Sequence, residues 1–110
     1  MDEGFSDFVF PLKCYWLLSD ADVNVNVNNP IRLAVMVPKK RFPHAVDRNR
    51  LKRLMRECFR QNKTLVSVPE GKSLSICWIT VAKEMPSFQN VLESAVAILE
   101  KINVEMRVSE

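Results

Sequence analysis

Residues 39–60 read KKRFPHAVDRNRLKRLMRECFR, a stretch that combines a helical pattern of apolar residues with many basic ones. Its apolar side chains follow the i, i+3, i+4, i+7, i+8 spacing of a helix with one buried face, at Leu51, Leu54, Met55, Cys58 and Phe59. We therefore expect a helix that begins between Pro43 and Asp47 and ends near Asn62.

The opposite face of this helix is cationic and carries Asn49, Lys52, Arg53, Arg56 and Arg60. Solvated surface helices usually place acids and bases four residues apart, whereas three i,i+4 neighbours here join like charges, each at a cost of about 0.2–0.5 kcal/mol. We expect Glu57 to reach Arg53 and Arg60 and to relieve part of this repulsion. The pattern favours a surface that binds a polyanion over a merely solvated helix.

Charge is segregated along the chain. Residues 39–63 hold ten basic residues and two acids, a net charge of +8, whereas the remainder holds six basic residues and eleven acids. Such asymmetry indicates a polyanionic partner. Basic amphipathic helices also bind membranes or calmodulin-like proteins, but here the domain core requires the apolar face.

The flanking segments predict strands and a second helix. Residues 8–18 alternate with Phe8, Phe10, Leu12, Cys14 and Trp16 on one face and Pro11, Lys13 and Tyr15 on the other, and residues 31–37 alternate similarly. Residues 74–82 are rich in β-branched and aromatic residues, as in a buried strand. Pro86 suits the first turn of a closing helix, whose apolar stripe comprises Phe88, Val91, Leu92, Ala95, Val96, Leu99 and Ile102.

These elements predict an α+β fold in the order β-β-α-β-α, with a mixed sheet of about four strands packed with two helices. Residues 1–110 form a single domain, because the length leaves no room for a second core. Residues 19–30 contain the turn formers of a loop.

The residue types argue against a catalytic or metal centre in the protein. His44 is the single histidine, Asp20 and Asp22 lie in the predicted loop, and the three cysteines form no C-x-x-C pair. A protein nuclease usually requires convergent carboxylates or a histidine base. The cysteines should be reduced and mostly buried. No run approaches a membrane span, and the acidic N-terminus is unlike a signal peptide, so we expect a cytoplasmic protein.

Residues 39–60 closely resemble the signature of the bacterial ribonuclease P protein family. The match joins a Lys-Lys pair after a strand, an Ala-Val step, the triplet Arg48-Asn49-Arg50 and a basic continuation at fixed spacing. The resemblance implies the fold of the second domain of ribosomal protein S5. It also implies a subunit of an RNA enzyme that removes the 5′ leader of precursor tRNA, with chemistry carried by Mg²⁺ held mainly by the RNA.

The resemblance also implies the partners and site residues. The ribonuclease P RNA subunit would be bound by Lys39, Lys40, Arg41, Arg48, Asn49, Arg50, Lys52, Arg53, Arg56 and Arg60. The leader of precursor tRNA would lie in a cleft on the sheet faced by Lys13, Tyr15, Ala34 and Met36. No residue is expected to be catalytic or a metal ligand, and the free protein should be a monomer in a ribonucleoprotein.

Two features depart from the family pattern. Family chains usually begin with a further basic segment and a helix that walls the leader cleft, and neither precedes Gly4. We therefore expect a chain that lacks this helix, through truncation or a late start. Pro38 and Pro43 flank the basic connection and should stiffen it. The alternative is another nucleic-acid module, such as a ribosomal protein or a helix in a DNA major groove, which would bind without supporting cleavage.

Overall fold

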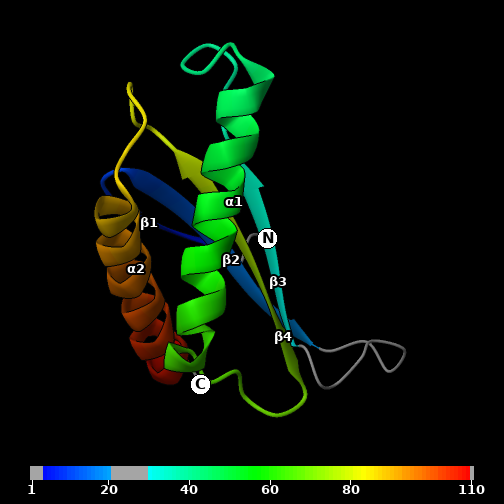
Figure 1. Ribbon diagram of the computed structural model, residues 1–110. Coiled ribbons are helices and arrows are strands. Elements are labelled where there is room, and N and C mark those ends of the chain that lie inside the picture. The colour runs from blue at the N-terminus through cyan, green and yellow to red at the C-terminus, as the bar shows by residue number, and fades with distance from the viewer. Residues whose placement is uncertain (1–3, 21–29, 110) are drawn as a thin grey trace.

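A computed structural model describes residues 4–20 and 30–109. The elements are β1 (Phe5–Val9), β2 (Leu12–Asp20), β3 (Ile31–Met36), α1 (Ala45–Asn62), a 3-10 turn (Lys63–Leu65), β4 (Lys72–Thr80) and α2 (Phe88–Ser109). The sheet order is β1-β2-β4-β3, in which β3 and β4 are parallel and the other pairs antiparallel. Both helices cover one face of the sheet (Figure 1). The predicted α+β fold with a four-stranded mixed sheet and two helices is confirmed.

The observed order of elements along the chain is β-β-β-α-β-α, which has one strand more than the predicted order. The single strand expected over residues 8–18 is two strands, because the chain reverses at Phe10 and Pro11, which are joined by a cis peptide bond. The apolar alternation does not stop at this turn. Phe8 pairs with Lys13 and is exposed, as is Phe10, so the prediction that they share one face with Leu12, Cys14 and Trp16 was wrong.

The core lies between the sheet and the two helices. Leu12, Cys14 and Trp16 of β2 point into it, as predicted. The alternating residues of β4 and the stripe of α1 at Leu51, Met55 and Cys58 are also buried. Phe59 meets the ring of Trp78 edge-on, with centroids 5.9 Å apart. Burial raises the pKa of the Cys14 thiol to about 12 and that of Cys58 to about 11, and all three cysteines are free.

α2 begins later than predicted. The hydroxyl of Ser87 accepts a hydrogen bond from the backbone N–H of Asn90 at 3.1 Å, which is the contact of a helix N-cap. Pro86 therefore precedes the helix and does not occupy its first turn. The predicted stripe is buried or partly buried from Val91 onward. Phe88, which was assigned to the same stripe, is 41% exposed.

Some predictions concern residues outside the described ranges. Residues 21–29, most of the predicted loop, are not described, and neither are residues 1–3, so the expectation about an N-terminal helix stays a prediction. The described chain starts with Gly4 and enters β1 at Phe5. Within the described ranges, no helix has the length and apolar character to cross a membrane.

Candidate nucleic-acid interface

The exposed side of α1 forms a continuous cationic surface, which we call the basic surface. A shallow hollow of about 410 Å³ runs along it and is lined by Asn49, Lys52, Arg53, Arg56, Glu57 and Arg60. The predicted polar face of the helix is thus brought together as one surface. That these residues bind RNA stays a prediction.

Arg48 is held by the turn that precedes α1. Its Nη1 donates hydrogen bonds to the backbone carbonyls of Phe42 and Pro43, both at 2.9 Å. The same turn is closed by the amides of Arg41 and Phe42, which donate to the Pro38 carbonyl at 3.2 and 3.1 Å. The side chain of Arg48 therefore ties the start of α1 to the turn that carries the three exposed cations Lys39, Lys40 and Arg41.

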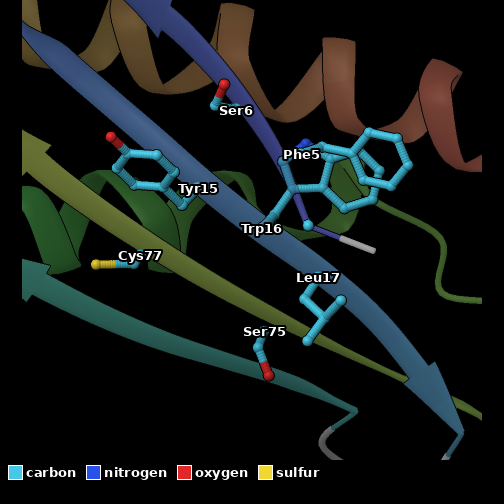
Figure 2. Close-up of a pocket in the computed structure, with 8 residues that line it drawn as sticks. Phe5, Ser6, Tyr15, Trp16, Leu17, Ser75 and Cys77 are labelled. Atoms are coloured by element: carbon cyan, nitrogen blue, oxygen red, sulfur yellow. The ribbon is translucent and has the colours of Figure 1, made fainter. Parts of the chain in front are cut away.

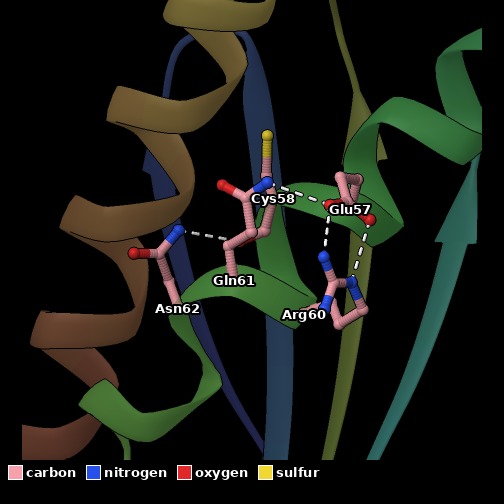
Figure 3. Close-up of polar contacts among 5 residues, drawn as sticks. All are labelled: Glu57, Cys58, Arg60, Gln61 and Asn62. Atoms are coloured by element: carbon pink, nitrogen blue, oxygen red, sulfur yellow. Dashed lines mark hydrogen bonds and ion pairs between the residues drawn. The ribbon is translucent and has the colours of Figure 1, made fainter.

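Arg60 has its own counter-charge. Its Nε and Nη2 donate to the two carboxylate oxygens of Glu57 at 3.0 and 2.6 Å, and Gln61 donates to the same carboxylate at 2.9 Å (Figure 3). The hydrogen bonds from Arg60, which have the larger effect, and from Gln61 lower the pKa of Glu57 to about 2. The expected partnership of Glu57 with Arg60 is confirmed. The expected one with Arg53 is not present, because among the described residues Glu57 forms its ion pair with Arg60.

Four cations of α1 have neither an ion pair nor a side-chain hydrogen bond within the described part of the chain, namely Arg50, Lys52, Arg53 and Arg56. Arg53 and Arg56 are exposed and lie on the same hollow. Arg56 has Lys52 and Arg60 as its i±4 neighbours, and like charges at this spacing are destabilising. The basic surface therefore keeps a positive field that the described residues do not neutralise.

The second candidate surface is the open face of the sheet, opposite the helices. Cross-strand pairing places Tyr15, Cys77 and Ala34 in one row and Lys13, Ile79 and Met36 in the next. Lys13, Tyr15, Ala34 and Met36 are all exposed, so the structure brings the four predicted cleft residues onto adjacent rows. The Nζ of Lys13 lies 5.3 Å from the centroid of the Tyr15 ring.

Sequence reasoning missed part of this face. Phe8 extends the row of Lys13, and Ser6 extends the row of Tyr15. A hollow of about 500 Å³ beside Tyr15 is lined by Gly4, Phe5, Ser6, Trp16, Leu17, Ser75 and Cys77 (Figure 2). A turn signal at Phe10-Pro11, read as a hairpin, is the clue that would have placed Phe8 correctly.

The histidine and the two aspartates that were considered in the sequence lie at the ends of elements or outside the described residues. His44 occupies the N-cap position of α1 and makes no side-chain cap hydrogen bond. Asp20 is paired with Lys72 at 2.7 Å, and the hydrogen bond from Lys72 lowers the pKa of its carboxyl group. Asp22 lies outside the described residues. Residues 4–20 and 30–109 hold no group of three or more His, Cys, Asp or Glu that could bind a metal ion.

Comparison with known proteins decides the family. The family model described as Ribonuclease P matches residues 11–103, which include the whole of α1 and the residues Lys13, Tyr15, Ala34 and Met36 of the open sheet face. The chain belongs to the ribonuclease P protein family. A ribonuclease P protein component from Porphyromonas gingivalis is 37% identical over 92 residues, which cover 81% of this chain and 64% of that relative. One from Chlorobium phaeobacteroides is 30% identical, covering 84% and 70%.

Solved structures agree with this membership of the ribonuclease P family. The ribonuclease P protein of Thermotoga maritima superposes with a TM-score of 0.70 at 27% identity, covering 90% of this chain and 84% of that one. A mutant of the Staphylococcus aureus ribonuclease P protein gives a TM-score of 0.61 at 26% identity, covering 91% and 75%. The chain spans less than two thirds of the length of the Porphyromonas relative.

Proposed function

We propose that this chain is the protein subunit of ribonuclease P and binds the catalytic RNA subunit through the basic surface and the adjoining turn. The residues proposed to contact that RNA are Lys39, Lys40, Arg41, Arg48, Asn49, Arg50, Lys52, Arg53, Arg56 and Arg60. The observation that carries the proposal is the uncompensated charge of Arg50, Arg53 and Arg56 on one side of α1. A guanidinium group can form hydrogen bonds to two phosphate oxygens at once, so the phosphates of an RNA backbone would supply the missing counter-charge.

The open sheet face is proposed to receive the 5′ leader of precursor tRNA. A single strand binds to proteins by stacking its bases on aromatic rings beside a positive charge. Tyr15 is 43% exposed and has Lys13 against its ring, so both requirements meet at one place on β2. Ala34 and Met36 of β3 extend the same face and provide apolar contact area.

The endonucleolytic step is assigned to the RNA partner. Phosphodiester hydrolysis of this kind needs metal ions to activate water and stabilise the leaving oxygen. Glu57, the carboxylate on the basic surface, is engaged by Arg60 and Gln61, so the residues there do not fit a protein-held Mg²⁺. We propose that Mg²⁺ is held mainly by the RNA subunit and that the protein assists substrate binding as a non-catalytic part of a cytoplasmic ribonucleoprotein. The free protein is proposed to be monomeric.

Reconstitution tests the proposal. The purified chain is combined with the ribonuclease P RNA subunit of the same organism, and removal of the 5′ leader is measured at low Mg²⁺ with wild type, Arg53→Ala and Arg107→Ala. Arg107 is an exposed cation in the last turn of α2 and does not line the hollow of the basic surface. Wild type and Arg107→Ala should stimulate cleavage, and Arg53→Ala should stimulate it less. Binding of the RNA without any stimulation would instead favour a non-catalytic nucleic-acid module.

A further inference from the structure

A separate hollow lies where α1 passes the start of α2. It measures about 450 Å³, which falls in the size range of small-ligand sites, and is lined by Arg50, Arg53, Leu54, Glu57, Met85, Pro86, Ser87 and Phe88. We call it the α1–α2 hollow. It shares Arg53 and Glu57 with the hollow of the basic surface and extends from there to the start of α2, whose residues Met85, Pro86, Ser87 and Phe88 were assigned no function above.

One wall of the α1–α2 hollow is apolar and includes an exposed ring. Phe88 is 41% and Met85 37% exposed, whereas Val91, Leu92, Ala95, Leu99 and Ile102 of the α2 stripe lie in the core or pack against it. The Ser87 cap sets Phe88 as the first helical residue, which holds the backbone below the ring in place. The exposed part of the Phe88 ring offers a flat surface that makes no aromatic ring contact within the described part of the chain.

The other wall is cationic. Arg50 and Arg53 lie three residues apart on α1 and are exposed, and neither has an ion pair within the described part of the chain. Glu57, which also lines the hollow, is occupied by Arg60 and Gln61. The hollow therefore presents a ring for stacking and two guanidinium groups for phosphate. This combination matches a nucleotide, because a base offers a π-face and its flanking phosphates offer paired oxygens.

We propose that the α1–α2 hollow binds one unpaired nucleotide of the RNA partner, with its base stacked on Phe88 and its phosphates at Arg50 and Arg53. The inference rests on the proposed function, in which α1 lies against RNA. Bases within a duplex have both faces covered by their neighbours, so the hollow selects a bulged or looped-out nucleotide. The contact would tie α1 to one particular nucleotide of the RNA, whereas phosphate contacts carry no sequence information.

The test measures the affinity of the full chain for the ribonuclease P RNA subunit of the same organism. Because stacking of one base on an aromatic ring contributes to the binding free energy, Phe88→Ala should weaken RNA binding by roughly 5- to 100-fold. Phe88→Trp keeps an aromatic ring and should bind like wild type. Val104→Ala is the matched control, because Val104 is an exposed apolar residue farther along the same helix. Chemical probing of the bound RNA should show one nucleotide that is protected by wild type and accessible with Phe88→Ala.

The salt dependence of binding separates this proposal from the proposed function. Phe88→Ala should leave the slope of log affinity against log salt unchanged, whereas Arg56→Ala should flatten it by about one unit. Wild-type affinity for Phe88→Ala, together with weaker binding by Arg56→Ala, would overturn the nucleotide site and leave the proposed function standing. A flatter slope for Phe88→Ala would also overturn it, since the ring would then act through the phosphate contacts. Wild-type binding by both variants would overturn both proposals.

Discussion

The guanidinium group of Arg48 donates a hydrogen bond to the backbone carbonyl of Phe42 at 2.9 Å, and this bond joins α1 to the turn before it. A second bond from the same nitrogen reaches the Pro43 carbonyl. Phe42 itself is buried in the core. Arg48 therefore connects the basic turn, the helix and the core, and its role differs from that of the outward-facing arginines.

Arg48→Ala should lower the free energy of unfolding by about 1 kcal/mol, because it removes two charge-assisted hydrogen bonds, one part-buried and one exposed. Arg53→Ala, the matched control on the exposed side of α1, should change it by less than about 0.5 kcal/mol. Urea denaturation of the two variants measures the difference. Equal unfolding free energies would show that the Arg48 contacts contribute nothing to the fold.

Arg56→Gln should stabilise the free protein while weakening its binding to RNA. The substitution removes the repulsion between Arg56 and Lys52, which is worth about 0.2–0.5 kcal/mol at i,i+4 spacing. Unfolding at low ionic strength should show a small gain that disappears in high salt. A loss of stability would mean that Arg56 is held by contacts within the protein and is not reserved for a partner.

The stability of the protein should fall as the pH is lowered from about 4.5 towards 2, in part through Glu57. Its pKa is about 2 in the folded chain, below its ordinary value of 4.5. A carboxyl group whose pKa is depressed on folding contributes stability above the unfolded pKa and loses it as the pH falls through the folded value. Glu57→Gln should therefore show a flatter pH dependence of unfolding than wild type in this window. Parallel curves would contradict the ion pair with Arg60.

Tyr15→Ala should reduce the preference of the holoenzyme for precursor tRNA over mature tRNA by roughly 5- to 100-fold, the value of one base stacked on an aromatic side chain. Tyr15→Phe should keep the preference, because the ring is retained. Phe10→Ala is the control, since Phe10 is exposed at the hairpin turn, outside the paired rows of the open face. If Tyr15→Ala kept the full preference for precursor tRNA, the 5′ leader would not bind on the open sheet face.

The sequence predicted the parts of the fold that depend on periodic burial. The helix with Leu51, Met55 and Cys58 on one side was placed correctly, because apolar side chains at this spacing have one stable arrangement against a sheet. The hairpin at Phe10-Pro11 was missed, because apolar residues continue on both sides of the turn and hide the reversal of the chain. The same error put Phe8 on the wrong face.

The sequence predicted which charged residues form the candidate site, but it did not predict which side chains bond to one another there. The spacing of Lys52, Arg53 and Arg56 sufficed to place them on one side of a helix. The contact of Arg48 with the turn, and the choice of Arg60 over Arg53 by Glu57, depend on side-chain geometry that spacing leaves open. The exposure of Phe88 was hidden for a different reason, because its position in the stripe matched the core but the helix begins at that residue.

The most direct test of the central claim is the salt dependence of affinity for the ribonuclease P RNA subunit. With about four to six phosphate contacts, log affinity should fall with log salt at a slope of about −3 to −5. Arg53→Ala should flatten the slope by about one unit, and Arg107→Ala should leave it unchanged. A slope near zero, or equal effects of the two substitutions, would contradict an RNA interface on the basic surface of α1.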